Sequence, residues 1–426
     1  CLSFSLSLMS LKLRSKNDWG RLDMTSEWNH FALGEITELV IDYRGKTPKK
    51  LGGDWCKQGY RALSAKNIKT GRIVQAETIR YIDESLYRKW MKDEVQRGDI
   101  LITSEAPFGQ IFFWDSDEKI VLSQRLFCVR IKPEYDARFI YYYMTTPEFQ
   151  SELDGRATGT TVIGLRQPEL MKCVIRCPEI QEQKVIAAIL SSIDAKIIAN
   201  EKVNDNLQQQ AAALFESWFV NYDPWDGVQP SEWENAPLGS FVEIKRGGSP
   251  RPIQDFLSDS GLRWLKISDV TSLSSPFVLE IKEHIKEEGL RKTVFLHAGE
   301  LVLSNSATPG IPKILDVDTC IHDGWLYFPK SELSKYYLYL FFKHIRKELV
   351  ALGNGSVFTN LKTDILKAFP ATKADESTLK EFDALVTPLF DAMLNADREN
   401  FKLAAMRDAL LPKLMSGEID VSSVLL

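Results

Sequence analysis

The chain has 426 residues, of which 26% are charged and 44% are hydrophobic, and its formal net charge is −5. This length predicts two or three domains, each large enough to bury its own core. The composition excludes a membrane-spanning helix, because no apolar run is long enough to cross a bilayer. The cysteines lack paired spacing, which argues against a disulfide framework or a zinc site and predicts reduced thiols in a cytoplasmic protein. They are Cys1, Cys56, Cys128, Cys173, Cys177 and Cys320.

The first stretch, residues 1–23, is expected to be a disordered extension. Its apolar start has neither a basic region before it nor a small-residue cleavage site, so a signal peptide is not indicated. Met24 looks like a natural beginning. The first folded domain is therefore expected over residues 24–178.

This first domain has the pattern of a mixed α+β fold. Short β-rich segments are separated by turns that contain Gly or Pro, which is typical of strands. Residues 137–149 predict a helix, and we expect its tyrosines, Tyr141 and Tyr143, to pack in the core. The alternative is a platform on which bases stack. The strands are expected at 100–103, 110–114 and 126–131.

Basic residues are concentrated in one part of this domain. Between Asp42 and Arg72 the acids are Asp42 and Asp54, against nine basic residues. Phosphate binding needs a local basic patch and not a global excess of charge, so the negative net charge does not exclude a nucleic-acid partner. The basic residues are Arg44, Lys46, Lys49, Lys50, Lys57, Arg61, Lys66, Lys69 and Arg72.

A long helix is predicted over residues 179–221. Its apolar positions alternate in steps of three and four, which indicates a coiled-coil seam, with Asn200 and Asn204 in that seam. A second such tract, at 371–426, carries Asn400. The two helices are expected to pair, because a buried Asn at a seam position is best known for fixing register. The alternative is that each seam packs on its own neighbouring domain. Both tracts carry more acids than bases, which would keep DNA on the domains.

Turn residues at 221–230 mark a hinge into a second domain, predicted at 222–370. Motifs of the first domain recur here in the same order, so the sequence predicts one unit, a globular domain followed by a helix, in two copies. The matched pairs are Leu33-Gly34 with Leu238-Gly239, Arg44-Gly45-Lys46-Thr47-Pro48 with Arg246-Gly247-Gly248-Ser249-Pro250, Leu63–Ile68 with Leu265–Val270, Gly98–Leu101 with Gly299–Val302, Ala106–Gly109 with Ala307–Gly310, and Gly159–Val162 with Gly355–Phe358.

Catalytic motifs are weak in this sequence. Tyr222-Asp223-Pro224-Trp225 is similar to the DPPY segment of adenine methyltransferases, but no glycine-rich loop for S-adenosylmethionine precedes it, which favours a linker turn. Glu182-Gln183-Lys184 has the form of a nuclease ExK motif without its upstream partner, so a solvated helix face is the simpler interpretation. The sequence contains neither a GxxxxGK[ST] loop nor a His-based triad. It indicates a non-catalytic chain.

Binding residues are easier to propose. The loop Arg44–Pro48 and its counterpart Arg246–Arg251 combine glycine, which permits close backbone approach, with side chains suited to phosphates or guanine edges. The alternative is a basic surface turn. Small polar groups near 158–161 and 354–356 are either contacts or structural turns. The candidate DNA-binding residues are Arg44, Lys46, Thr47, Lys49, Lys50, Lys66, Asn67, Thr160, Arg246, Ser249, Arg251, Lys266, Ser268, Asn354 and Ser356.

Together these features resemble the specificity (S) subunit of type I restriction–modification enzymes, over residues 28–426. The stretches Pro178-Glu-Ile-Gln-Glu-Gln-Lys184 and Leu410-Leu-Pro-Lys-Leu-Met-Ser-Gly-Glu-Ile419 are similar to the conserved helical regions of that family. There are two departures. Pro388 is expected to interrupt the second helix, and residues 371–376 are a divergent version of the family's helix start.

The resemblance implies two tandem homologous α+β target-recognition domains, separated by two long helices that form an antiparallel coiled coil. Each domain would read one half of a bipartite, asymmetric DNA site. The helices would also dock two methyltransferase (M) subunits, and restriction (R) subunits would complete the ATP-dependent nuclease. S-adenosylmethionine, Mg²⁺ and ATP would belong to those partners, so no cofactor is expected in this chain. The competing classes are an adenine methyltransferase with a fused recognition domain and a scaffold that does not bind DNA.

Overall fold

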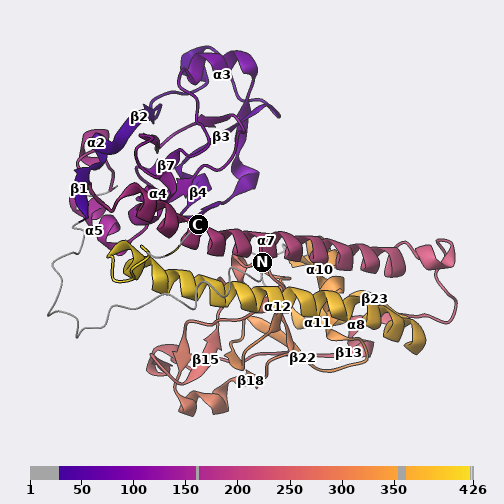
Figure 1. Cartoon of the computed structure of the whole chain (residues 1–426). Coiled ribbons are helices and arrows are strands. Elements are labelled where there is room, and N and C mark those ends of the chain that lie inside the picture. The colour runs from indigo at the N-terminus through magenta and orange to yellow at the C-terminus, as the bar shows by residue number, and fades with distance from the viewer. Residues whose placement is uncertain (1–27, 160–162, 354–360, 423, 425–426) are drawn as a thin grey trace. The chain divides into compact units, whose positions relative to one another are not determined.

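A computed structural model describes residues 28–159, 163–353, 361–422 and 424 (Figure 1). The predicted extension, residues 1–23, lies outside this part of the chain. The chain forms two compact units: unit 1 is Cys1–Asp194 with Ala404–Leu426, and unit 2 is Ala195–Leu403. Each unit therefore includes part of both long helices, whereas the sequence analysis treated the helices as separate segments.

The main sheet of unit 1 is antiparallel, with the strand order β2-β10-β7-β8. All four residues of its central strand β7 are buried, as expected for a strand covered on both faces. These strands confirm the three predicted from sequence, the middle one being shorter. The bounds are β2 (Thr37–Asp42), β7 (Ile100–Thr103), β8 (Ile111–Phe113) and β10 (Leu126–Ile131).

A second sheet of unit 1 has the order β6-β3-β9, in which β3 and β9 are parallel. A two-stranded sheet, β1 with β11, closes the domain, and β4 pairs with β5. The remaining bounds are β1 (Asn29–Ala32), β3 (Tyr60–Leu63), β4 (Ile68–Lys69), β5 (Arg72–Ile73), β6 (Arg80–Ile82), β9 (Ile120–Leu122), β11 (Val174–Cys177), α2 (Leu33–Ile36), η2 (Lys49–Leu51), η3 (Ala65–Asn67), η4 (Ala76–Thr78), α3 (Glu84–Trp90) and α6 (Gln167–Leu170).

The helix predicted at 137–149 is two helices, α4 (Ala137–Met144) and α5 (Pro147–Arg156). The break falls where Thr146 caps α5 and Pro147 takes its first turn, a position that proline favours. Tyr141 and Tyr143 are 7% and 2% exposed. They pack in the core as expected, which rules out the base-stacking alternative.

Unit 2 repeats this plan with larger sheets. Its main sheet has the order β13-β22-β19-β20-β16, its second sheet the order β14-β17-β15-β21-β18, and β12 pairs with β23. The bounds are β12 (Glu234–Pro237), β13 (Val242–Arg246), β14 (Leu257–Ser258), β15 (Leu262–Leu265), β16 (Phe277–Val278), β17 (His284–Ile285), β18 (Val294–Leu296), β19 (Leu301–Ser304), β20 (Pro312–Leu315), β21 (Thr319–Ile321), β22 (Trp325–Ser331) and β23 (Pro370–Lys373).

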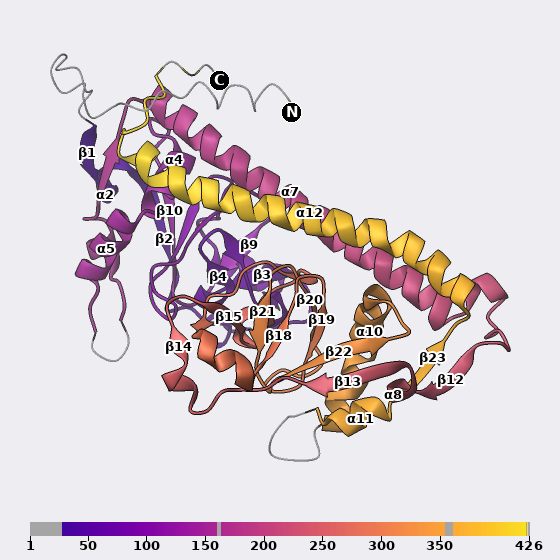
Figure 2. The ribbon, with the colours of Figure 1, turned by 90° about the horizontal axis from the view of Figure 1, so that it is seen from below.

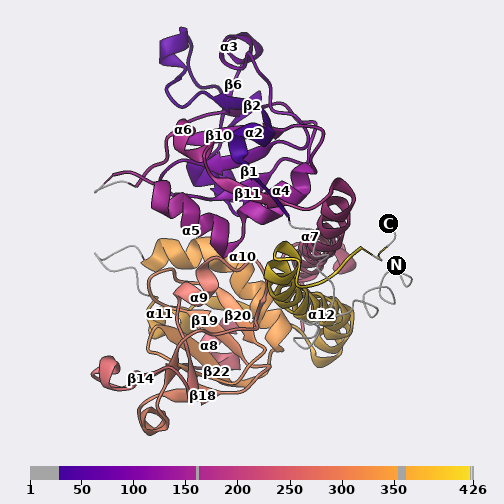
Figure 3. The same cartoon turned by 60° about the vertical axis from the view of Figure 1, so that its left-hand side comes forward.

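The helix α10 (Lys335–Gly353) packs on β20 of this sheet (Figure 3). Its core side chains, among them Phe342 and Leu349, are fully buried. Unit 2 also has the short elements η5 (Asp223–Trp225), α8 (Leu238–Phe241), η6 (Ile253–Asp255), α9 (Ser268–Thr271), η7 (Glu287–Lys292) and α11 (Thr363–Lys367).

The two units are copies of one backbone design, which confirms the predicted repeat. Gly98 and Gly299 have the same positive φ of 95°, and Ala106 and Ala307 both have positive φ. Equivalent backbone hydrogen bonds recur with nearly equal N–O distances. They are Leu33 to Cys173 (2.7 Å) and Leu238 to Phe369 (2.8 Å), Ser104 to Arg125 (2.9 Å) and Asn305 to Gly324 (2.9 Å), and Leu165 to Ser104 (2.9 Å) and Leu361 to Asn305 (2.7 Å).

One sequence equivalence is wrong by two residues. The alignment set Arg44 against Arg246, but Asp42 pairs with Phe127 in unit 1 and Arg246 pairs with Leu326 in unit 2. Phe127 and Leu326 are equivalent by their pairing with the preceding strand. Arg246 therefore stands at the position of Asp42. The shared Arg-Gly and Pro letters of the two loops explain the slip, because they match in sequence while the strand pairing sets them two residues apart.

The long helices are α7 (Ile180–Phe219) and α12 (Glu376–Met415), each of 40 residues. They lie side by side in each unit (Figures 1 and 2). In unit 1, Arg407 donates from Nη1 to Asp194 Oδ1 (2.9 Å), and buried residues of the two helices share one core. Those residues are Val185, Ile186, Ile189, Leu190, Leu414 and Met415.

In unit 2 the seam contains the predicted Asn residues. Asn200 donates from Nδ2 to Asn400 Oδ1 (2.8 Å), and Asn204 donates to Asp397 Oδ1 (2.7 Å). Contacts move back along α12 as they advance along α7, so the helices are antiparallel. The pairing predicted from the seams is confirmed. Helix α7 also packs on its neighbouring domain, as the alternative interpretation expected, because Phe215 lies in the core of unit 2.

Helix α12 runs through Pro388 without a break, so the expected interruption is wrong. Proline removes one backbone donor and leaves the carbonyl of residue 384 without its helical partner. Both Pro388 and Ala384 are exposed, so water is available to hydrate that carbonyl. The cost of the missing hydrogen bond is lowest on this face.

The hinge residues 221–230 form turns around η5. The indole of Trp225 contacts those of Trp218 and Trp233 edge to face, with ring centroids 5.8 and 4.8 Å apart. This packing supports the linker interpretation of the Tyr222–Trp225 segment. Among the described residues, none of the helices is long and apolar enough to cross a bilayer.

Candidate nucleic-acid interface

In unit 1 a cleft lies at one end of the main sheet. Because neighbouring strands are antiparallel, the ends of β2 and β7 and the starts of β8 and β10 meet at the same edge. Loops attached there surround a cleft of about 440 Å³. Its lining is Arg44, Ser104, Glu105, Gln124, Arg125, Thr158, Gly164, Leu165 and Arg166. Three arginines against one glutamate give the cleft a positive balance.

Arg44 is held firmly inside this cleft. Its Nε and Nη2 donate to the two carboxylate oxygens of Asp42, both at 2.8 Å, and Nη1 donates to the carbonyl of Leu165 (3.2 Å). Its guanidinium lies 4.0 Å from the centre of the Phe127 ring. A bidentate pair of this kind fixes the orientation of the arginine. Arg44 keeps 31% of its side chain exposed, so it presents a preset edge to the cleft.

The other candidates in this loop point to different places. Lys46 donates from Nζ to the carbonyl of Trp90 (2.6 Å) and lies over the Tyr43 ring. Burial lowers its pKa. It is turned toward the end of α3 and does not line the cleft. Lys49 and Lys50 are exposed, and Thr47 accepts from the backbone of Lys50 (3.4 Å).

The pair Lys66 and Asn67 divides into one exposed cation and one structural amide. Lys66 is exposed. Asn67 is 1% exposed, accepts from the backbone N–H of Ser64 (3.1 Å) and donates to Thr78 Oγ1 (3.0 Å). The structure therefore gives Asn67 a role inside its turn. Sequence could not separate this role from a DNA contact, since Asn serves both.

Unit 2 uses the same turn design. Asp269, the equivalent of Asn67, accepts from the backbone of Lys266 (2.9 Å). Lys266 forms an ion pair with Glu283. Ser268 is exposed at the start of α9. Two of the predicted contacts, Lys266 and Ser268, therefore flank a turn whose capping group is buried in the first copy and partly exposed in the second.

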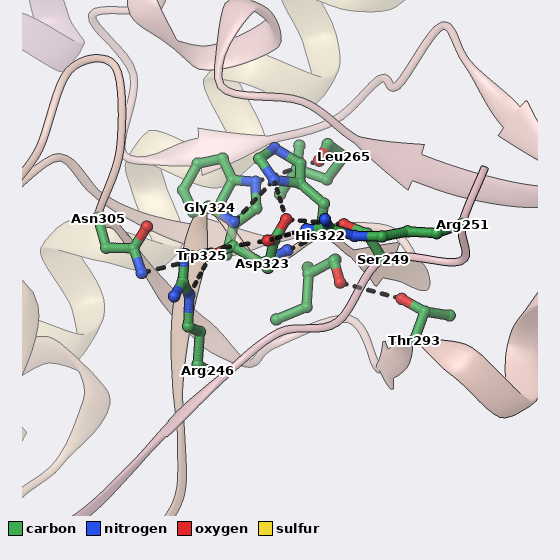
Figure 4. Close-up of polar contacts among 11 residues, drawn as sticks. Arg246, Ser249, Arg251, Leu265, Thr293, Asn305, His322, Asp323, Gly324 and Trp325 are labelled. Atoms are coloured by element: carbon green, nitrogen blue, oxygen red, sulfur yellow. Dashed lines mark hydrogen bonds and ion pairs between the residues drawn. The ribbon is translucent and has the colours of Figure 1, made fainter. Parts of the chain in front are cut away.

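The loop Arg246–Arg251 gathers around one residue that the sequence analysis did not select, Asp323 (Figure 4). Ser249 donates from Oγ to Asp323 Oδ1 (2.8 Å), and Arg251 donates from Nη2 to Oδ2 (3.1 Å). Arg246 donates to the Asp323 carbonyl, and its Nη2 lies 4.0 Å from Oδ2. The predicted trio is thus brought together, with its positive charge centred on a carboxylate.

Burial and charge tune the groups of this turn. Burial raises the pKa of Asp323, but the Ser249 hydroxyl and the nearby arginines outweigh it and hold the pKa below the usual value. Burial lowers the pKa of His322; the Asp323 carboxylate raises it, but the pKa stays below its usual value. At neutral pH, Asp323 is ionised and His322 is neutral. The turn therefore offers one anionic acceptor flanked by cations.

Comparison with known sequences identifies the protein family of this chain. A sequence model of the type I restriction modification DNA specificity domain matches residues 25–209 and 230–372, well over half of the chain. The chain belongs to this family. The two matched segments correspond to the two copies of the domain and include the loops described above.

Individual relatives agree with that assignment. The type I restriction enzyme MjaIX specificity subunit of Methanocaldococcus jannaschii is 25% identical over 347 residues, which cover 77% of this chain and 79% of that protein. The HindI specificity subunit of Haemophilus influenzae is 23% identical over 408 residues, covering 77% and 88%. The crystal structure of the S subunit from M. genitalium is similar in fold, with a TM-score of 0.58, 16% identity and coverage of 92% and 97%.

Membership of the specificity family places this chain in recognition and not in catalysis, which confirms the prediction of a non-catalytic chain. Within the described residues, no group of three or more His, Cys, Asp or Glu side chains is placed to hold a metal ion. The five cysteines of that part, Cys56 to Cys320, are free thiols.

Thr160, Asn354 and Ser356 lie outside the described residues. The sequence analysis did not select Gln124 and Arg125, which line the cleft of unit 1, nor Asp42 and Asp323, which bind the predicted arginines Arg44 and Arg251. A partial signal existed: Gln124 and Arg125 immediately precede the predicted strand 126–131, and the observed antiparallel pairing of that strand with β2 brings them to the Arg44 loop.

Proposed function

We propose that this specificity subunit binds a bipartite, asymmetric DNA site, each recognition domain reading one half. The observation that carries the proposal is the recurrence of one loop arrangement at the equivalent sheet edge of both units, with different side chains on it. Because the loop backbone is the same in both units, both domains would approach DNA in the same way. Because the side chains differ, each domain would select a different half-site sequence. Sequence is read by contacts to base edges, whereas phosphate contacts give position.

Exposed cations support the phosphate part of this proposal. Lys49, Lys50 and Lys66 in unit 1 and Arg251 in unit 2 are exposed. None of the four stands on α7 or α12. Neutralising phosphates releases counterions, which gives affinity that falls with salt. We therefore assign backbone contacts to these residues, and base contacts to the loops at the sheet edge.

The helix pair suits the role of a spacer. A helix of 40 residues is about 60 Å long at 1.5 Å per residue, and asparagine layers fix the register of the pair. We propose that this pair sets the length of the unread gap between the half-sites.

The same helices are proposed to dock two M subunits. Large apolar side chains are exposed on them: Ile198 (47%), Val203 (52%), Leu385 (47%) and Phe401 (48%). Exposed apolar residues on a rigid helix favour a protein partner over solvent. R subunits would then join this core, and S-adenosylmethionine, Mg²⁺ and ATP are assigned to the partner subunits, in the cytoplasm.

The decisive experiment uses the chain assembled with its M subunits. The complex methylates a library of duplexes with two randomised segments and a variable gap, and modified adenines are then mapped by sequencing. We expect two unlike half-sites at a fixed separation. Binding of S-adenosylmethionine by this chain alone would favour the fused methyltransferase, and failure of the complex to retain duplex DNA would favour the scaffold.

A further inference from the structure

The turn that precedes β10 in unit 1 and β22 in unit 2 has a fixed backbone in both copies. Ser104 donates to the Arg125 carbonyl and Asn305 donates to the Gly324 carbonyl, each at 2.9 Å. In unit 1 the Gln124 carbonyl accepts from Ala65 (3.1 Å). In unit 2 the Asp323 carbonyl accepts from the side chain of Arg246. The main chain of the turn is thus tied down twice in each copy.

Glycines press the neighbouring loop onto this turn in unit 2. A Cβ on Gly247 would lie 2.3 Å from the His322 carbonyl oxygen, and a Cβ on Gly324 would lie 2.2 Å from the His322 ring. At Gly247 the contact is with the backbone, so a side chain there would displace the turn, whereas at Gly324 it would push the His322 ring and the Ser306 hydroxyl aside. Position 323 is therefore a place in this turn where the side chain can vary while the main chain stays.

The side chains at the equivalent position differ in chemistry. Gln124 is exposed in the cleft of unit 1, and Asp323 is 39% exposed in unit 2. An ionised carboxylate has about four acceptor sites, and Ser249 and Arg251 occupy one on each oxygen, so acceptor capacity remains. Glutamine offers a donor and an acceptor together, whereas the carboxylate offers acceptors alone.

We infer that Gln124 and Asp323 are the residues that discriminate a base in their respective half-sites, an inference that rests on the proposed function. An acceptor-only group selects an exocyclic amine such as cytosine N4, and glutamine pairs with the N6 and N7 of adenine. A bare carboxylate near DNA would be repelled by phosphates. The flanking Arg246 and Arg251 offset that repulsion, which explains why an acid occupies a DNA-reading loop.

The test exchanges carboxylate and amide groups at the two positions while keeping the shape of each side chain. Asp323→Asn and Gln124→Glu are the two nearly isosteric changes. The exposed Asp259→Asn removes an acid elsewhere in unit 2 and controls for net charge. Each variant is assembled with M subunits and assayed on duplexes randomised in both half-sites, with thermal unfolding as a check on folding.

Asp323→Asn is expected to change base preference at one position of one half-site by about tenfold or more, leaving the other half-site unchanged. Gln124→Glu is expected to change base preference in the other half-site alone, and Asp259→Asn is expected to change the preference in neither half-site. Unchanged base preferences would overturn the inference. An equal loss of methylation on every sequence would also overturn it, because Asp323 would then only position the loop. If wild type itself shows no sequence preference, the proposed function fails instead.

Discussion

At the scale of single residues, Arg44 shows how one ion pair prepares a binding group. Asp42 holds one edge of its guanidinium through Nε and Nη2, and Phe127 supports its face. This ordering happens before any ligand arrives, so less side-chain entropy is lost on binding. It also means that removal of the Arg44 side chain takes two charged hydrogen bonds away from the Asp42 carboxylate.

We therefore predict that Arg44→Ala weakens binding of target DNA by the complex by about tenfold, equivalent to roughly 1.4 kcal/mol. Glu201→Ala, an exposed change on α7, is expected to have no effect. Fluorescence titrations at one fixed salt concentration measure both. Equal losses in the two variants would contradict the assignment of DNA binding to the domain loops and not to the helices. The double change Asp42→Asn with Arg44→Ala should recover part of the loss.

Lys313 couples protonation to the stability of unit 2. It is 3% exposed on β20, and its ammonium donates to the carbonyls of Leu273 (2.8 Å) and Ser275. Burial, aided by the charge of Lys343, lowers its pKa from 10.5 to about 8. Below pH 8 the folded state must carry a buried charge, which costs about 3 kcal/mol at 1.36 kcal/mol per pH unit.

The sign follows from proton counting. Between pH 8 and 10.5 the unfolded chain binds the proton that the folded chain has released, so the free energy of unfolding rises with pH in this window. Lys313→Met should lack this rise. Chemical denaturation of both proteins from pH 7.5 to 10.5 checks it, and parallel pH profiles would show that Lys313 does not titrate as described.

At the scale of elements, the seam of the long helices was readable from sequence because apolar spacing directly encodes which face is buried. The end of α5 and the loops at the sheet edge were not, because their positions depend on contacts between residues far apart in sequence. Asn and Lys are residue types that often contact DNA, yet Asn67 caps a buried turn and Lys46 binds the Trp90 carbonyl.

The helix pair gives an element-scale prediction. Insertion of one heptad into α7 between Asn200 and Leu207, matched by one heptad in α12 between Met393 and Asn400, lengthens both helices by about 10.5 Å. A heptad turns the seam by only about 20°, so the pairing survives. We expect the methylated gap to become longer.

Methylation of a gap-length library by the complex measures this effect, and both half-sites should stay the same. An unmatched heptad in α7 alone is the control, because it breaks the Asn200–Asn400 layer and should reduce assembly. A changed half-site sequence in the matched variant would refute the spacer role.

At the scale of the whole molecule, the chain separates two surfaces: basic loops on the domains and apolar positions on the helices. The net charge of −5 does not reveal the basic loops, whereas the distribution of charged residues along the sequence does. The duplication was visible as repeated motifs, but the two-residue slip at Arg246 was not. Strand pairing, which the sequence does not display, fixes that register.

The apolar surface predicts a partner-binding defect. Phe401→Asp replaces a 48% exposed ring by a charge and should weaken assembly with M subunits by at least about tenfold, as measured by titration of M subunits without DNA. Ala384→Asp is the control, since Ala384 is exposed on the same helix, about 100° around its axis. Equal assembly of both variants would remove Phe401 from the docking surface.

The core of unit 1 contains Leu414, Met415, Ile419 and Val421 beside residues of the first domain. Unit 2, by contrast, is made from one unbroken segment, Ala195–Leu403. During synthesis the ribosome therefore delivers everything that unit 2 needs before unit 1 can close. The domain that is translated first is the one that finishes folding last, and until Val421 emerges its unfilled core is a natural target for chaperones.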